Sequence, residues 1–76
     1  MGWTFDIQKL ITLRELKNLS RQDCAKAIRK TARAYGLKEQ GRFPFTVHEL
    51  CDLANAFGVD PRSFFTQKSN GDKKAA

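Results

Sequence analysis

Apolar residues recur at steps of three and four residues near the start of the chain. This spacing gathers apolar side chains on one face of a helix. It predicts a first helix over residues 6–18. The residues that form the face are Ile7, Leu10, Ile11, Leu13 and Leu16.

A second, short helix is predicted to begin after Ser20. The Ser20 hydroxyl can cap the free amide groups of a first turn, and Asp23 stands three residues later, as in a weaker form of the capping box. Small and apolar residues then follow at helical spacing and should face inward. They are Cys24, Ala25 and Ile28.

A third helix is predicted from Thr31, a further candidate N-cap, through a helix-permissive stretch that ends at Glu39. Tyr35 is its one large apolar anchor. The turn of residues 29–31 would separate it from the second helix. The alternative is one longer or kinked helix over residues 20–39, although Thr31 and Gly36 both weaken a continuous helix.

Residues 42–45 are predicted to be an extended connector, because Pro44 disfavours helical backbone at the residue before it. A full capping box, Thr46 to Glu49, then opens the clearest helical pattern in the chain. Gly58 follows the pattern where a helix end favours positive φ. The inward face of this fourth helix is expected to hold Val47, Leu50, Cys51, Ala54 and Phe57.

The end of the chain predicts one more helix and a tail. Asp60 and Pro61 are a typical N-cap and first helical residue, so a short fifth helix should carry Phe64 and Phe65 onto the core. Residues 67–76 are polar and Lys-rich, which predicts a flexible tail. With no strand alternation and no internal repeat, the expected fold is all-α, with about five short helices in one domain over residues 1–66.

Two aromatic residues precede the first helix, Trp3 and Phe5. Small domains often use such side chains to cover the open end of the core, and we expect that use here. The alternative is a dimer contact that they form together with Phe64 and Phe65, because large aromatic residues are enriched at interfaces.

Length and charge limit the classes of function. A chain of 76 residues buries only about 60% of its unfolded surface, which excludes a deep active-site cleft. No apolar run approaches the ~18 residues that span a bilayer. The net charge is +6, and residues 20–45 alone carry +5, from seven Lys and Arg against two Asp and Glu. This concentration favours an anionic polymer as the partner.

The residues Cys24, Cys51 and His48 raise the question of a metal site. A structural zinc site usually takes four Cys or His ligands, and the chain has only these three. We therefore expect no metal, no cofactor and no catalytic residues, so that the protein is not an enzyme. Two cysteines form no disulfide framework, and no leader sequence is recognised, so a reducing cytoplasm is the expected compartment.

The order and spacing of these features resemble the phage-repressor-like helix-turn-helix family, which includes lambda repressor, Cro and the XRE class of bacterial regulators. The resemblance covers residues 6–66. The family often has Gly where this chain has Arg29 and an apolar residue where it has Lys30. The residues that carry the resemblance are Leu13, Arg14, Glu15, Leu16, Leu19, Ser20, Asp23, Ala25, Ile28, Thr31, Tyr35, Lys38, Glu39, Gly41, Pro44, Phe45, Thr46, Glu49, Leu50, Leu53, Ala54, Phe57, Gly58, Val59, Phe64 and Phe65.

The resemblance implies which residues touch DNA. The family reads bases from its third helix, which here places Ala32, Arg33, Gly36 and Leu37 against the base edges. Arg33 is the strongest candidate, since a guanidinium donates two parallel hydrogen bonds to guanine. The positions that touch phosphates in the family correspond to Ser20, Arg21, Lys30, Thr31, Lys38, Gln40 and Arg42.

Two further charges have a structural role in the family. Arg14 and Glu39 correspond to a pair that ties the first helix to the end of the third, and we expect that ion pair here.

The function implied by the resemblance is a sequence-specific regulator that binds double-stranded DNA, most plausibly a phage or bacterial repressor. A homodimer on a pseudo-palindromic operator is expected, with no membrane partner and no small-molecule ligand. The terminal aromatic residues would supply the dimer contact, or the chain would be the DNA-binding part of a longer regulator. The alternative function is a protein-interaction module, such as an antitoxin or antirepressor, that keeps the fold without binding an operator.

Overall fold

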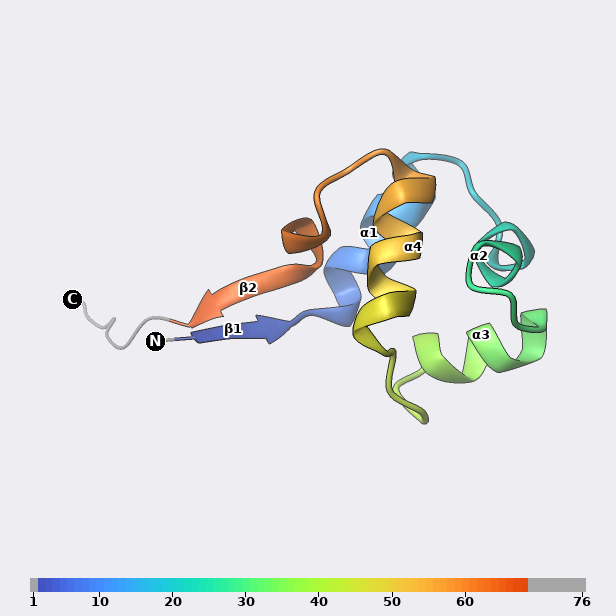
Figure 1. Cartoon of the computed structure of the whole chain (residues 1–76), viewed down its shortest axis with the longest axis horizontal. Coiled ribbons are helices and arrows are strands. Elements are labelled where there is room, and N and C mark those ends of the chain that lie inside the picture. Colours follow the sequence, from blue (N-terminus) through green and yellow to red (C-terminus); the bar gives the residue numbers. More distant parts are fainter. Residues whose placement is uncertain (1, 69–76) are drawn as a thin grey trace.

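The computed structural model describes residues 2–68, and the part of the predicted tail over residues 69–76 lies outside the described residues. The described chain is mostly helical, with one small antiparallel sheet (Figure 1). None of its helices is long and apolar enough to cross a membrane. In chain order its elements are β1 (Gly2–Phe5), α1 (Ile7–Leu16), α2 (Arg21–Ala27), α3 (Ala32–Glu39), α4 (Val47–Phe57), the 3₁₀ helix η1 (Pro61–Phe64) and β2 (Phe65–Lys68).

Every α-helix begins at a side-chain cap. The side chains of Asp6, Ser20, Thr31 and Thr46 each accept a hydrogen bond from a backbone N–H of the first turn. Full capping boxes are present at Ser20 and Thr46. Such caps satisfy amide groups that have no partner inside the helix, so these four residues fix where the helices begin.

The α-helices also end alike, each at a residue with left-handed backbone. After α2 this residue is Arg29, with φ 59°. Its N–H donates to Lys26 O at 3.1 Å, and the N–H of Lys30 donates to Ala25 O at 2.9 Å. This is the Schellman motif, which normally uses glycine. The corresponding residues after α1, α3 and α4 are Asn18, Gly41 and Gly58.

The turn at Arg29 separates α2 from α3, so residues 20–39 form two helices and the alternative of one continuous helix is wrong. Arg29 takes the left-handed conformation at the position where the resemblance leads one to expect Gly. The turn therefore keeps a glycine-like shape although a side chain is present.

The prediction of a mostly helical fold is confirmed, but the fold is not strictly all-α, because β1 pairs with β2. Phe5 lies opposite Phe65, and their rings meet edge to face with centroids 5.7 Å apart. Each strand has only four residues, too few for alternation to stand out, and the two strands come from opposite ends of the chain. Gln67 and Lys68, predicted to begin the tail, belong to β2.

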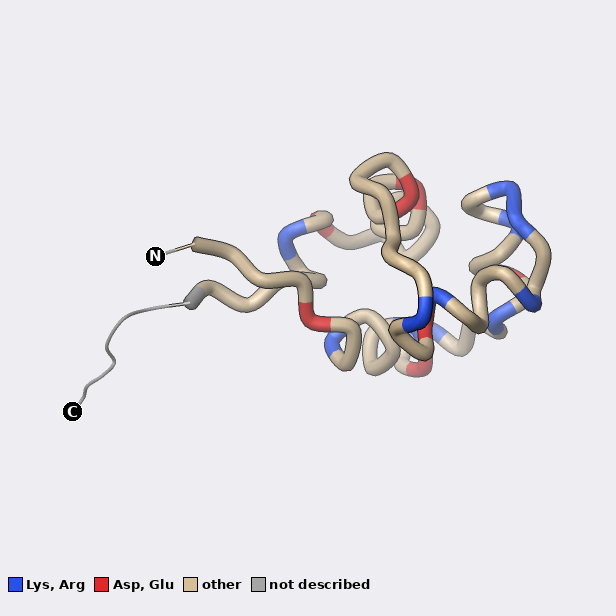
Figure 2. The backbone as a smooth tube through the Cα atoms, turned by 90° about the horizontal axis from the view of Figure 1, so that it is seen from below, with Lys and Arg blue, Asp and Glu red and all other residues tan. Residues whose placement is uncertain are grey.

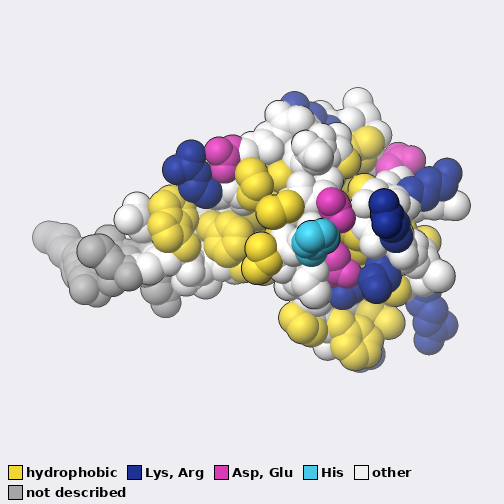
Figure 3. Space-filling model, viewed as in Figure 1, with side chains coloured by type: hydrophobic (Ala, Val, Ile, Leu, Met, Phe, Trp, Pro, Cys, Tyr) yellow, Lys and Arg dark blue, Asp and Glu magenta, His cyan; other side chains and the backbone are white. Residues whose placement is uncertain are grey.

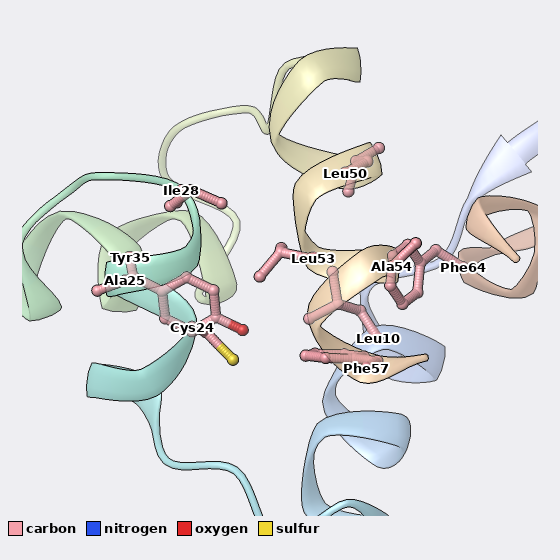
Figure 4. Packing of buried hydrophobic residues seen from close by; sticks show 10 residues of the cluster. All are labelled: Leu10, Cys24, Ala25, Ile28, Tyr35, Leu50, Leu53, Ala54, Phe57 and Phe64. Carbon is pink, nitrogen blue, oxygen red and sulfur yellow. The ribbon is translucent and has the colours of Figure 1, made fainter. Parts of the chain in front are cut away.

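The core lies between α4 and the layers formed by α1, η1 and the α2–α3 pair (Figure 4). Leu10, Tyr35, Leu53 and Phe64 are fully buried. Phe57 and Phe64 pack edge to face, with ring centroids 5.5 Å apart. The short final helix thus brings Phe64 to the core, and its 3₁₀ form gives way to β2 before Phe65, which is half-buried.

Four residues expected on the core are exposed instead. Leu16 ends α1 and Val47 begins α4, so both lie beyond the part of their helix that packs. Cys51 is about 100° around α4 from Leu50, the buried residue before it. Trp3, with 55% of its surface exposed, lies on β1 beyond the core, so it does not close the core's open end.

Candidate functional site

Six residues of α2, α3 and the residue after α3 line one shallow surface groove, which we name the α2–α3 groove. Along α3 the spacing places one set of side chains outward, while Tyr35 and Glu39 face inward and are buried. All six lining residues belong to the sets that the sequence assigned to bases or phosphates. They are Arg21, Ala32, Arg33, Gly36, Leu37 and Gln40.

Small side chains keep part of this groove open. Ala32 is exposed on the first turn of α3, and a Cβ added at Gly36 would meet nothing within 4 Å. Leu37 is half-buried, and Arg33 is exposed. A large ligand can therefore approach the backbone of α3 closely, with the long cationic side chains of Arg21 and Arg33 beside it.

Cationic residues gather at the end of the molecule formed by α2 and α3, opposite the end that holds the sheet (Figures 2 and 3). Arg29 and Lys30, in the turn between α2 and α3, and Arg33 on α3 are exposed. Their placement in space matches the +5 charge of residues 20–45. Of these exposed cations, Arg33 lines the α2–α3 groove, whereas Arg29 and Lys30 line a separate hollow together with residues of α4.

A buried carboxylate lies at one side of the groove. The side chain of Glu39 is only 3% exposed, yet it accepts three hydrogen bonds from charged or polar side chains. Arg14 Nε donates to Oε2 at 2.7 Å, and the Tyr35 hydroxyl donates to the same oxygen at 2.9 Å. Arg21 Nε donates to the other oxygen, Oε1, at 2.9 Å.

This network fixes three helices relative to one another. Besides its bond to Glu39, Arg14 donates from Nη1 to Leu19 O at 2.9 Å, directly before the cap of α2. The network thus joins α1, the start of α2 and the end of α3. Arg14 and Glu39 were paired from the sequence, and the structure brings them together, with Tyr35 and Arg21 as additional partners.

Burial and charge act on this network together. Burial alone lowers the pKa of Arg14, but the hydrogen bond and the negative charge of Glu39 outweigh it and raise that pKa above its usual value. Burial, followed by the neighbouring Cys24 and Glu39, raises the pKa of Tyr35. Arg14 therefore stays charged and the Tyr35 hydroxyl stays protonated, as donors to the carboxylate.

Lys38, assigned from the sequence to phosphates, is held inside the protein. Its ammonium lies 3.1 Å from Glu49 Oε1 and donates to Pro44 O at 3.0 Å, and its side chain is only 13% exposed. It also lies over the ring of Phe45, 5.9 Å from the centroid. Lys38 thus ties α3 to the connector and to α4, and the structure does not bring it to the groove.

The remaining residues assigned to phosphates do not line the groove. The Ser20 and Thr31 hydroxyl oxygens accept the capping hydrogen bonds of α2 and α3, each at 3.0 Å. Lys30 lies beside Arg29 at a separate hollow, which it shares with residues of α4. Arg42 is exposed in the connector after α3.

Two features of this region were missed by the sequence reasoning. Arg29 has strained left-handed backbone, and its only signal was a side chain at a position where the resembled family has Gly. The bond between Arg21 and Glu39 had no signal, because the two residues are 18 positions apart and on different helices.

The candidate metal ligands named from the sequence do not lie together. Cys24 is buried, where desolvation raises the pKa of its thiol, whereas Cys51 is exposed. Within residues 2–68, no group of three or more His, Cys, Asp or Glu side chains is placed to hold a metal ion.

Comparison of the chain with protein-family models, with curated proteins and with solved structures gives no match.

Proposed function

We propose that this protein is a sequence-specific regulator that binds double-stranded DNA as a repressor, with α2 and α3 as a helix-turn-helix. The observation that carries the proposal is the α2–α3 groove. Its six lining residues were each assigned to DNA contact through the resemblance, and they line one groove that includes two arginines, Arg21 and Arg33.

The arrangement of α2 and α3 suits entry of α3 into a major groove. Two short helices joined by a tight turn are the usual form of the motif, in which the second helix reads base edges from its N-terminal part. Here the first turn of α3 presents Ala32 and Arg33, both exposed, directly after the Thr31 cap. The buried network around Glu39 holds the two helices in this relation.

Base reading would rest mainly on one side chain. The Arg33 guanidinium can donate two hydrogen bonds to guanine O6 and N7. Ala32 and Leu37 offer only apolar contact, of the kind made with a thymine methyl, and Gly36 lets the DNA approach closely. Because so few side chains can form hydrogen bonds with base edges, DNA shape would supply part of the specificity.

Phosphate contacts would fix the register of the protein on the duplex. Lys38 is left out, since its ammonium is engaged with Glu49. Two copies would bind a pseudo-palindromic operator with half-sites about one helical turn apart, and would repress by covering a promoter. The residues proposed for phosphate contact are Arg21, Gln40, Lys30, Arg42 and the hydroxyls of Ser20 and Thr31.

A second candidate function is a protein-interaction module, such as an antitoxin or antirepressor. The observation that favours it is an apolar hollow beside the connector, bordered by the exposed residues Phe43 and Val47. Phe43 has 55% of its surface exposed and Val47 has 78%. Exposed apolar patches of this kind are typical of protein contacts.

Selection of bound duplexes from a random DNA pool, followed by a salt titration on the recovered site, tests the proposal. An enriched inverted repeat supports a dimeric, sequence-specific regulator. The affinity should fall steeply with salt, by about 0.9 log unit per log unit of salt for each phosphate contacted. No enrichment and an affinity insensitive to salt would overturn the proposal in favour of the protein-interaction module.

A further inference from the structure

Glu39 does more than pair with Arg14, because its second oxygen holds an arginine of the groove. Arg21 is the first residue of α2, and its side chain is 58% exposed although its Nε is bonded to the buried Oε1 of Glu39. We propose that Glu39 is a positioning residue that fixes the Arg21 guanidinium so that its outer edge receives a DNA phosphate. This inference rests on the proposed function.

The division of hydrogen bonds makes this geometry possible. Arg14 and Tyr35 both bond to Oε2 of Glu39, which leaves Oε1 for Arg21. Arg21 uses only Nε there, and within the described part of the chain its Nη1 and Nη2 have no hydrogen-bond partner. A guanidinium held by Nε presents its two terminal nitrogens outward, and that pair matches two oxygens of a phosphate.

The charges favour an anion at this position. A carboxylate paired with Arg21 alone would cancel its charge and weaken attraction for phosphate. Glu39 is also paired with Arg14, whose side chain is 11% exposed and lies on the protein side of the carboxylate. The group of two arginines and one glutamate therefore keeps a net positive charge, and its exposed member is Arg21.

Arg21 is both close to the other groove arginine and held rigidly. Arg21 lines the α2–α3 groove together with Arg33, so both guanidinium groups serve the same face. A free arginine loses side-chain entropy when it binds, whereas one already held by a buried carboxylate loses less. Glu39 thus holds the Arg21 guanidinium in its phosphate-binding position before DNA binds. A phosphate bound there would help to fix which bases α3 faces.

Two substitutions of Arg21 show whether DNA binding needs a guanidinium held in place by Glu39 or only a positive charge at this position. Arg21→Gln should weaken operator binding about tenfold and lower the slope of log affinity against log salt by about 0.9, the loss of one phosphate contact. Arg21→Lys keeps the charge, but its single ammonium is drawn to Glu39 and presents no outer pair of donors. It should therefore lose nearly as much affinity as Arg21→Gln.

Arg62→Lys is the matched control. Arg62 is also paired with a carboxylate, Asp60, at 3.1 Å, but η1 carries it outside the groove. This variant should bind DNA as the unmodified protein does. If Arg21→Lys also binds with unchanged affinity, Arg21 acts only through its charge and the inference is overturned.

The role of Glu39 is tested by a double-mutant cycle. Glu39→Gln should weaken binding about as much as Arg21→Gln, and it should add no further loss in the Arg21→Gln background. If Glu39→Gln lowers DNA affinity by the same factor in the Arg21→Gln background, Glu39 does not act through Arg21 and the inference is overturned. Because Glu39→Gln removes the partner of a buried arginine and can prevent folding, a second measurement uses the unmodified protein.

That measurement is the hydrogen exchange of arginine Nε–H groups, followed by NMR in the free protein. The Nε–H of Arg21 should exchange much more slowly than that of the exposed Arg33, and it should stay protected when DNA binds. Equal exchange of the two groups would overturn the inference. The two failures can be told apart. If the unmodified protein binds no duplex DNA, the proposed function fails, whatever the exchange rate of the Arg21 Nε–H.

Discussion

The Lys38 ammonium lies 3.1 Å from Glu49 Oε1 and joins the last turn of α3 to the first turn of α4. The same oxygen accepts the backbone N–H of Thr46 at 2.9 Å, so one carboxylate serves both the cap and the ion pair. This relationship divides the cations of α3. Arg33 is exposed and available to a ligand, whereas Lys38 stabilises the contact between α3 and α4.

Lys38→Met should therefore reduce stability rather than DNA affinity. It removes a charged hydrogen bond to a carboxylate that is 9% exposed, and we expect a loss of about 2 kcal/mol in the free energy of unfolding, measured with urea. The salt slope of DNA binding should stay unchanged. A smaller slope with full stability would return Lys38 to the phosphate contacts.

Arg33→Ala should act on specificity. If Arg33 reads a guanine, operator binding should weaken by about 1–3 kcal/mol, while binding to random duplex changes far less. Competition between the two DNAs, measured by fluorescence anisotropy, gives the ratio. Equal losses on both DNAs would reassign Arg33 to a phosphate, and Arg62→Ala serves as the control outside the groove.

Arg29→Gly should stabilise the protein by about 1 kcal/mol, because a side chain in left-handed backbone is strained and glycine is not. Arg29→Ala is the matched control, since it removes the long side chain and keeps the Cβ, and it should bring no such gain. The thermal midpoints of the unmodified protein and the two variants distinguish relief of backbone strain from loss of the charged side chain. A gain of the same size in Arg29→Ala would show that charge, not backbone strain, is relieved.

The stability should fall in acid through Glu49. Burial raises the pKa of this carboxyl, but the Thr46 backbone N–H and the Lys38 ammonium outweigh it and lower the pKa below its usual range. A lowered pKa contributes stability above the unfolded value, about 4.3, and this contribution is lost as the pH falls through the folded value. The thermal midpoint of Glu49→Gln should thus lie below that of the unmodified protein at neutral pH, and the gap should close below about pH 4.

The control for this pH dependence is Glu15→Gln. Glu15 is a largely exposed carboxyl, 3.9 Å from Arg14, and its removal should leave the acid dependence of the midpoint nearly unchanged. A gap between the unmodified protein and Glu49→Gln that stays constant down to acid pH would contradict the role given to Glu49.

The two thiols should differ sharply in reactivity. Cys51 is exposed, whereas Cys24 is buried and its pKa is raised by desolvation. A thiol reagent added to the native protein should modify one cysteine per chain quickly and the second only on unfolding. Cys51→Ser should abolish the fast reaction; a fast reaction that survives in this variant would place Cys24 at the surface.

Local signals predicted the helices well because each one acts over a few residues. The hydroxyls of Ser20 and Thr46 with their partners three positions on, and Gly58 at a helix end, appear in the structure as the expected caps. Tyr35, the one large apolar residue predicted for the third helix, is buried in α3 as expected. These features depend on hydrogen bonds and periodicity inside one element.

Contacts between distant elements could not be predicted in the same way. The pairing of Phe5 with Phe65 joins two strands too short to show a pattern. Arg21 and Lys38 look alike as exposed cations in the sequence, yet each is bonded to a buried glutamate on another helix. Which cation meets which carboxylate is decided by how the helices pack.

By itself the sequence determined where the helices begin, their caps and the excess of positive charge over residues 20–45, and its resemblance to a known family supplied the candidates for DNA contact. The end of the first helix was predicted at residue 18, but α1 ends at Leu16. Only the tertiary structure decided which of those candidates share one groove, that Lys38 is held inside, and that Arg21 is anchored by Glu39. The physical reason is that caps and periodicity are set by neighbours along the chain. The availability of a charge is set by whatever the fold packs against it.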